Sequence, residues 1–478
     1  MPNLRRNIVY QFLYELLIVF IPLFTIPYVS RVLGAENIGL FSYTYAVANY
    51  FVLFANLGIK NYGSRTIAMV RNNKEELNRN FSEILSIHII FSIIVIFVYL
   101  VLLFFFVEDN LVIFLIQSIY VFAAVFDINW FFFGIEKFKL TVGRNTLVKI
   151  LSVFLVLVFV KTQTDLWIYA LILALSVFVG QSVVWFALKQ YVSWRRPSWA
   201  NMKQHIRPLF VLFLPILALS LYKYMDKIML GSISSNVQVG FYENAEKIIN
   251  VPMSLIMAFG VVLMPRIANM VTSKDKGEVF KLIDMSMEAV MLLAIAISFG
   301  LAGISFVLAP IFFGYEFEEC GILIMGLAVT VPFMAFANVI RTQYLIPYKE
   351  DKIFVVSLFL GAAVNLIVNI ILIPYMAARG AVIGTIFAEI IVCIYQSYFV
   401  RKKIFIKKYL LNTIPPILIG IVMFVFVFQI GNVMNINIVT LILQLLVGMF
   451  IYAVGVFLLM LKSRTRLMVL LRKFVVRY

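Results

Sequence analysis

The chain of 478 residues is 63% hydrophobic and only 13% charged, whereas soluble domains are about 45–50% apolar and about 25% charged. This composition excludes a soluble fold, because no soluble core could hide so much apolar surface. The net charge of +17 lies in short segments between apolar runs, which argues against nucleic-acid binding and for a polytopic membrane protein. Two cysteines and two histidines predict neither a disulfide framework nor a metal site.

Fourteen apolar runs follow one another along the chain, each long enough to cross a bilayer. A crossing takes about 20 residues, and runs that are continuous rather than alternating predict helices instead of a barrel. The expected spans are 8–31, 37–60, 81–107, 111–134, 143–161, 165–189, 208–231, 238–264, 283–307, 318–346, 353–375, 379–400, 409–430 and 436–461.

The charge of the connections predicts the orientation of these spans. With the N-terminus inside, the inner connections hold 32 lysines and arginines, and the outer ones hold only Arg31, Lys161 and Arg379. Cytoplasmic loops carry such an excess of basic residues, so both termini are expected inside. The inner connections 61–80 and 189–207 are long enough for amphipathic helices on the inner surface. The basic tail 462–478 is expected against anionic headgroups.

An internal repeat divides the chain. Four pairs of identical residues share one spacing of 201 positions: Gly39 and Gly240, Arg65 and Arg266, Met69 and Met270, Val70 and Val271. Each copy holds six spans, so the copies have the same orientation and are expected to enclose a substrate path between them, as in transporters.

The repeat predicts four parts of the chain. They are a six-helix half (1–188), a cytoplasmic linker (189–207), a second six-helix half (208–401), and two extra helices with the basic tail (402–478). The fold class is therefore an all-α polytopic membrane protein with a central cavity.

Charged side chains within the spans are candidate functional residues, because a charge at mid-bilayer costs about 2.5–3.5 kcal/mol or more. They are Glu15, Asp127, Lys149, Lys223, Asp226, Lys227, Glu243, Glu246, Lys247, Arg341 and Glu389. Lys223 lies beyond mid-bilayer, with Asp226 three residues on as its expected partner.

Structural roles remain open for several of these charges. Lys149 and Arg341 are near enough to the inner face to extend their side chains to water. Asp226 with Lys227, and Glu246 with Lys247, are alternatively structural ion pairs. Arg65 and Arg266 stand at equivalent places on the inner side of the two halves.

Missing motifs narrow the function. The sequence contains no Gly-x-x-x-x-Gly-Lys-[Ser/Thr] phosphate loop, so hydrolysis of ATP by this chain is not expected. Short outer connections leave no room for the paired carboxylates of a membrane polymerase or glycosyltransferase. The sequence predicts a protein that is not an enzyme, with no catalytic residues, metal or cofactor.

Two stretches carry a family resemblance. The first runs from Asp226 to Ile248 and contains Asp-Lys-Ile-Met-Leu-Gly and then Gly240-Phe-Tyr-x-x-Ala-x-Lys-Ile. The second, near the start of the chain, is Ile26-Pro-Tyr-Val-Ser-Arg-Val-Leu-Gly-Ala-Glu-Asn-Ile-Gly. Over its whole length the chain resembles the polysaccharide flippases of the Wzx (RfbX-like) branch of the multidrug/oligosaccharidyl-lipid/polysaccharide exporter superfamily. The resemblance implies a multi-pass protein of the bacterial inner membrane. Its substrate would be an undecaprenyl-diphosphate-linked oligosaccharide, carried outward for capsule, O-antigen or a related polymer.

The resemblance also implies roles for the charges. Lys223, Lys247, Arg65 and Arg266 would receive the diphosphate and saccharide in a cationic cavity that Asp226, Lys227 and Glu15 also line. Coupling to an ion gradient would fall to Asp127, Glu243 or Glu389. Membrane lipid, and possible polymerase and chain-length proteins, are the implied partners.

Two alternatives stay open. A cation-coupled multidrug antiporter of the same fold would favour carboxylates in its cavity, and here lysines and carboxylates are mixed. A membrane-embedded polysaccharide polymerase or glycosyltransferase is the rival from another class, and the short outer connections speak against it.

Overall fold

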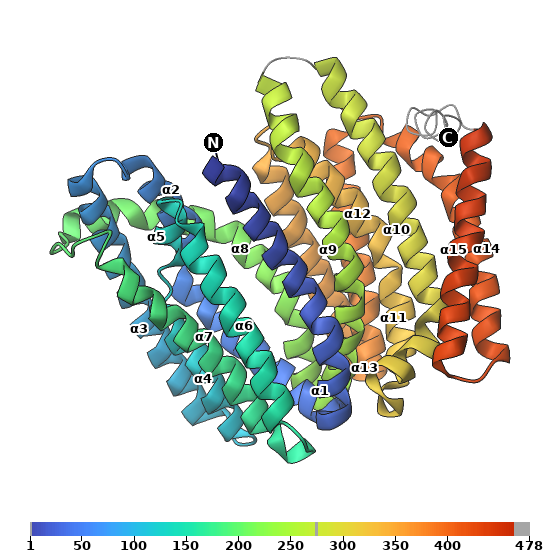
Figure 1. The fold of residues 1–478 in the computed structure, drawn as a ribbon, viewed down its shortest axis with the longest axis horizontal. Helices are drawn as coiled ribbons and strands as arrows, with labels where there is room; N and C mark the ends of the chain where they lie inside the picture. The colour runs from blue at the N-terminus through green and yellow to red at the C-terminus, as the bar shows by residue number, and fades with distance from the viewer. Residues whose placement is uncertain (1, 273–275, 463–478) are drawn as a thin grey trace. The chain divides into compact units, whose positions relative to one another are not determined.

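The computed structural model describes residues 2–272 and 276–462, and their side chains apart from 2–23, 138, 139, 222, 276 and 462. Within these ranges every regular element is a helix (Figure 1). The elements are α1 (Pro2–Asn56), α2 (Ile59–Val70), α3 (Lys74–Phe106), α4 (Leu111–Val125), α5 (Asn129–Gly134), α6 (Phe138–Phe159), η1 (Gln163–Asp165), α7 (Leu166–Leu188), α8 (Trp199–Ile233), α9 (Asn236–Thr272), α10 (Lys276–Phe313), η2 (Tyr315–Phe317), α11 (Cys320–Ala328), α12 (Thr330–Ile340), η3 (Arg341–Leu345), α13 (Asp351–Val400), α14 (Ile406–Val433) and α15 (Ile438–Lys462).

Twelve helices in the described residues are long and apolar enough to cross a membrane, which confirms an all-α membrane protein. Two of them, Phe24–Val70 and Asp351–Val400, have 47 and 50 residues. At about 1.5 Å per residue each is roughly 70 Å or more long, over twice the hydrocarbon core of about 30 Å. Each is broken by a non-helical residue, at Gly34 (φ 77°) and at Ala377 (φ 47°). These breaks lie between the expected spans 8–31 and 37–60, and between 353–375 and 379–400. Fourteen crossings and their orientation remain a prediction.

The expected span 111–134 coincides with the candidate crossing Leu111–Gly134, and within it the chain forms two helices. α4 ends at Val125 and α5 begins at Asn129. Between them Asp127 accepts a hydrogen bond from the backbone amide of Asn129 at 3.0 Å. A short polar side chain that captures a nearby amide competes with the helical hydrogen bonds, so this Asp-x-Asn turn interrupts the span.

Contacts divide the chain into two compact units, Met1–Gly231 and Ser232–Tyr478. In the first unit α8 runs antiparallel along α1 and α2, which explains why the seventh expected span belongs to this unit. The contacts pair Tyr43 with Gly231, Tyr50 with Tyr224, Phe54 with Phe213, Gly58 with Leu209, and Tyr62 with His205. The division at 189–207 follows the sequence repeat instead of packing and remains a prediction.

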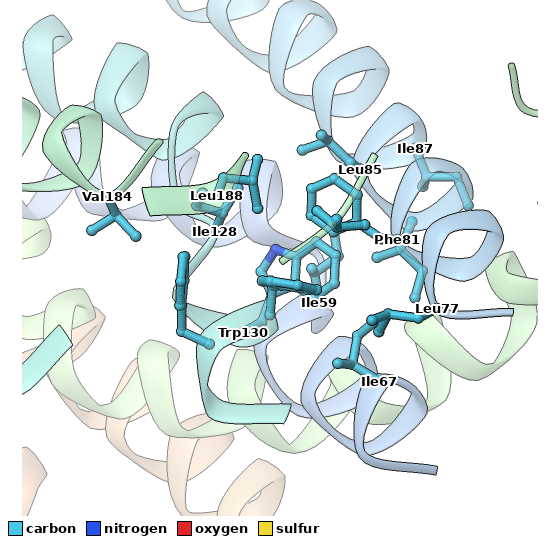
Figure 2. Close-up of a cluster of buried hydrophobic side chains, with 14 of the residues drawn as sticks. Ile59, Ile67, Leu77, Phe81, Leu85, Ile87, Ile128, Trp130, Val184 and Leu188 are labelled. Atoms are coloured by element: carbon cyan, nitrogen blue, oxygen red, sulfur yellow. The ribbon is translucent and has the colours of Figure 1, made fainter. Parts of the chain in front are cut away.

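A hydrophobic cluster around Trp130 forms part of the core of the first unit (Figure 2). The Trp130 and Phe81 rings stack with their centroids 5.6 Å apart. Gly63 of α2 makes this possible, since a Cβ there would lie 2.5 Å from the indole. α2 therefore buries its apolar face against α5 and α3. The amphipathic helix expected in 61–80 forms as a packed helix of the bundle, because its apolar face is covered by protein.

The linker lies along α3 and is not helical before Trp199. The Ser193 backbone amide donates to Asn78 Oδ1 at 3.0 Å, and the Arg195 backbone amide donates to Ser82 Oγ at 2.9 Å. The expected amphipathic helix over 189–207 is therefore restricted to the start of α8, because side chains of α3 take the amides that a helix would use.

Candidate functional site

An apolar cavity of about 920 Å³ opens in the second unit between α9, α10, α14 and α15; we call it the lipid-side groove. Its walls include Leu293 and Met449, whose exposed fractions are 47% and 61%. Two polar groups of its lining donate to backbone carbonyls: Tyr452 Oη to Leu292 O at 2.7 Å and Gln444 Nε2 to Val427 O at 2.8 Å. The groove can therefore accept a long apolar chain.

The sequence did not predict this groove. The thirteenth and fourteenth spans were expected only as additions to the repeat, yet α14 and α15 form half of its wall. The available signal was small residues on the facing helices, Gly300, Gly448 and Ala453, which leave space between membrane helices.

Lys223 is exposed, whereas Asp226 and Lys227, one turn further along α8, are buried at 4% and 7% exposure. The Lys223 ammonium lies 5.2 Å from the centroid of the Tyr224 ring, and among described residues it forms no ion pair. The expected pairing with Asp226 is therefore absent, because the two side chains lie in different environments. A cation held over an aromatic face stays available to an anion.

Lys247 in α9 is one-third exposed and pairs with Glu243, with Nζ 3.1 Å from Oε1. This pair lies four residues apart on one helix face, where side chains meet, whereas adjacent residues such as Glu246 and Lys247 diverge. Lys247 thus has a carboxylate neighbour that an incoming anion would have to displace.

The remaining predicted cavity residues lie on three different helices. Arg65 is exposed on α2 and Arg266 is exposed on α9. Glu15 lies in α1, but its side chain falls outside the described ones. Arg65 and Lys223 belong to the first unit and share no described contact, and Arg266 belongs to the second unit.

Asp127 belongs to a polar network that the sequence did not predict. Its Oδ1 accepts from Asn129 Nδ2 at 2.7 Å, and the same Nδ2 donates to Gln181 Oε1 at 2.8 Å. Arg144 Nη2 donates to Asn129 Oδ1 at 3.1 Å. The network joins α5, α6 and α7, and only their folding brings Asn129, Arg144 and Gln181 to Asp127.

Glu389 is buried at 6% exposure in α13, within electrostatic range of Arg341. Arg341 begins the π-helical turn η3 and donates from Nη2 to Asn338 Oδ1 at 2.6 Å. The Arg341 guanidinium carbon also lies 5.4 Å from the centroid of the Phe354 ring, at the inner start of the expected span 353–375. Extension of Arg341 toward the inner face therefore remains a prediction.

The fold and these charges define a multi-pass helical membrane protein, and a family model identifies its group. The chain belongs to the polysaccharide biosynthesis protein family, whose model matches residues 4–271, more than half of its length. A protein from Shigella dysenteriae named "Putative O-antigen transporter" is 24% identical over 408 residues, which cover 82% of this chain and 99% of that protein. A protein of the same name from Escherichia coli K12 is 26% identical over 84% of this chain and 97% of its own.

Solved structures agree with this fold. The lipid II flippase MurJ, in an inward closed conformation, matches 94% of this chain and 97% of its own with a TM-score of 0.74 at 15% identity. An inward-facing multidrug transporter of the MATE family matches 82% of this chain and 97% of its own with a TM-score of 0.63 at 14% identity. At these identities the likeness establishes the fold alone.

Proposed function

We propose that this chain is a flippase of the bacterial cytoplasmic membrane. It moves an undecaprenyl-diphosphate-linked oligosaccharide from the inner to the outer leaflet for assembly of O-antigen, capsule or a related polymer. The names of the O-antigen transporters and of the lipid II flippase support this substrate class.

The observation that carries the proposal is the pairing of an apolar groove with a cation on the same helix. Pro252 of α9 lines the lipid-side groove, and Lys247 lies five residues earlier. This spacing is about 7.5 Å along the helix axis and about 140° around it, so the head group would lie on another side of α9 from the groove. A polyprenyl diphosphate has the same two parts, a long apolar chain and an anionic head. The groove takes the chain, and Lys247 takes the diphosphate in exchange for Glu243.

Lys223 provides a second anion contact in the first unit, with Arg65 and Arg266 as further cations at the inner mouth. Asp226, Lys227 and Glu15 complete the polar lining, and Asp127, Glu243 and Glu389 are the carboxylates proposed for ion coupling. No bond is made or broken. The diphosphate cannot cross hydrocarbon unaided, so the cationic cavity only has to alternate between an inner and an outer opening. The flipped lipid-linked oligosaccharides then pass to the polymerase and chain-length proteins outside.

A cation-coupled multidrug antiporter is the second candidate, favoured by the match to the MATE transporter fold. Deletion of the gene in a strain with no second flippase separates the two. If the chain is a flippase, its deletion causes complete lipid-linked units to accumulate on the inner leaflet and abolishes surface polymer. The sugar transferases stay active. Normal surface polymer together with increased drug sensitivity would establish the antiporter instead.

A further inference from the structure

Three polar side chains from three helices meet in the hydrophobic interior of the first unit. His205 of α8 lies between Tyr62 of α2, with its Nδ1 2.6 Å from the phenol oxygen, and Glu83 of α3, with its Nε2 2.8 Å from Oε2. The His205 and Glu83 side chains are only 3% and 1% exposed. We call these three residues the Tyr–His–Glu site. The predicted function does not use it.

The chemistry of the Tyr–His–Glu site allows one proton to be added without loss of either hydrogen bond. In one state Tyr62 donates to Nδ1, and Nε2–H of a neutral imidazole donates to the Glu83 carboxylate. In the other, an imidazolium donates to both neighbours, because a tyrosine hydroxyl can accept as well as donate. Only the hydroxyl hydrogen has to rotate.

The two states differ in charge. The first state has one net negative charge, and the second has none. Glu83 Oε1 is buried and accepts no hydrogen bond from any described residue. A buried carboxylate with one partner is costly, so the proton stabilises the site.

Among the described residues, no further charged side chain forms an ion pair with Tyr62, His205 or Glu83. α2 adds Thr66, which interacts with the Tyr62 hydroxyl, and α5 carries no charged residue. The charged residues nearest along the three helices are all exposed: Arg65, Arg79, Lys203 and Arg207.

The position of the site gives the proton a mechanical consequence. His205 and Tyr62 form a contact near the beginning of α8, in its antiparallel packing on α1 and α2. His205 also lies near the end of the linker, which α3 already holds at Asn78 and Ser82. The site therefore fastens the beginning of the seventh expected span to the first bundle. A ligand that stabilises this fastened state shifts the conformational equilibrium toward it.

We propose that Tyr62, His205 and Glu83 form a proton-binding site that fastens the start of α8 to α2 and α3 more strongly when it is protonated than when the proton has left. The coupling of this site to transport rests on the proposed flippase function. The binding of the proton does not.

Proton binding is tested first, without substrate. The chain has only two histidines, so ¹⁵N NMR of histidine-labelled protein in nanodiscs gives two ring systems, and the His205→Gln variant assigns them. As the pH is lowered, His205 should change from one to two protonated ring nitrogens. Glu83→Gln should remove this change, because an amide does not balance an imidazolium.

The site would be overturned if the His205 ring kept a single protonated nitrogen at every pH at which the protein stays folded, or if it gained the second proton identically in Glu83→Gln. If Glu83→Gln does not fold, Tyr62→Phe replaces it. Loss of the phenol oxygen removes the acceptor of Nδ1–H, and the His205 titration should shift clearly from that of the unaltered protein. An unshifted titration in Tyr62→Phe contradicts the proposal equally.

Coupling is tested in vesicles that contain the full chain and a lipid-linked oligosaccharide, with and without an imposed pH gradient. The gradient should change the flipping rate of the unaltered protein and of Glu108→Gln, an exposed carboxylate of the same unit. Glu83→Gln should still flip substrate but respond less to the gradient. A full response in Glu83→Gln overturns the coupling, whereas absence of flipping under all conditions would contradict the proposed function and leave the NMR result standing.

Discussion

Lys223 is a cation in an apolar span that pairs with no described carboxylate and lies over the Tyr224 ring. Pro208 begins the expected span fifteen residues earlier, which places Lys223 roughly 22 Å along a helix that rises about 1.5 Å per residue. At that depth an exposed ammonium is costly, and a substrate anion offers compensation.

We expect Lys223→Ala to be inserted at normal abundance, because no partner charge is left unpaired. A hydrogen bond between charged groups contributes about 1.5–3 kcal/mol, so export of polymer should fall about tenfold or more. Lys223→Arg should retain part of it. Quantitative surface-polymer assays beside immunoblots check this, and normal export by Lys223→Ala would remove the lysine from the substrate path.

Gly58 is a residue whose conformation the fold requires. Its φ is +72°, and an added Cβ would lie 2.8 Å from Leu209 O and 3.0 Å from Phe213 N. The left-handed conformation costs other residues roughly 1–2 kcal/mol, and the backbone of α8 cannot yield cheaply. Gly58→Ala should therefore lower the unfolding temperature of the purified protein.

Gly143→Ala is the matched control for Gly58, since nothing lies within 4 Å of a Cβ there. In a helix interior alanine is better than glycine by about 0.5–1 kcal/mol, so this variant should unfold at the same or a higher temperature. Equal losses in both variants would contradict the close packing of α8 on α1 and α2.

At the scale of elements, the lipid-side groove gives α14 and α15 a function. Ala453 of α15 is exposed and lines the groove, and its neighbour Val454 is 41% exposed but does not. Ala453→Trp should fill the groove and reduce polymer export, because the polyprenyl chain then has no place to lie. Val454→Trp carries the same bulk on the lipid face and should export normally.

This prediction is tested by measuring protein abundance and surface polymer in cells that produce Ala453→Trp or Val454→Trp. Equal export by both would show that the groove does not take part in transport. Equal loss of abundance would show that tryptophan at either place disturbs insertion, and Ala453→Leu would then be compared with Val454→Leu.

Most spans could be predicted from the sequence, because hydropathy determines where a chain crosses a bilayer. The turn at Asp127 could not, since it depends on one side chain that captures the Asn129 amide. The π-helical turn at Arg341 is likewise a local departure from the α-helix that hydropathy does not predict.

Candidate cations were recognisable by residue type, but their neighbours were not. The pairing of Lys247 with Glu243, the ring beneath Lys223 and the groove all depend on which helices pack together.

At the scale of the whole molecule, the charge of the connections predicts both termini inside. In a cysteine-free background, single cysteines at 233, 315 and 433 should react with an impermeant reagent from outside, and those at 195 and 405 should not. Positions 233 and 433 end α8 and α14, and 315 begins η2. Labelling of position 195 from outside would contradict the fourteen-span topology, because every later helix would be inverted.

Flipping by the purified protein tests the central claim most directly. The full chain is reconstituted in sealed vesicles, and a fluorescent polyprenyl-diphosphate oligosaccharide is added to the outer leaflet. Protection of the fluorophore from an impermeant quencher reports its movement inward. The comparisons are vesicles without protein, vesicles with Lys223→Ala, and vesicles given a labelled multidrug substrate instead. The account predicts rapid protection of the lipid-linked oligosaccharide that needs the protein and slows strongly in Lys223→Ala. Protection no faster than in protein-free vesicles, with transport of the multidrug substrate, would contradict it.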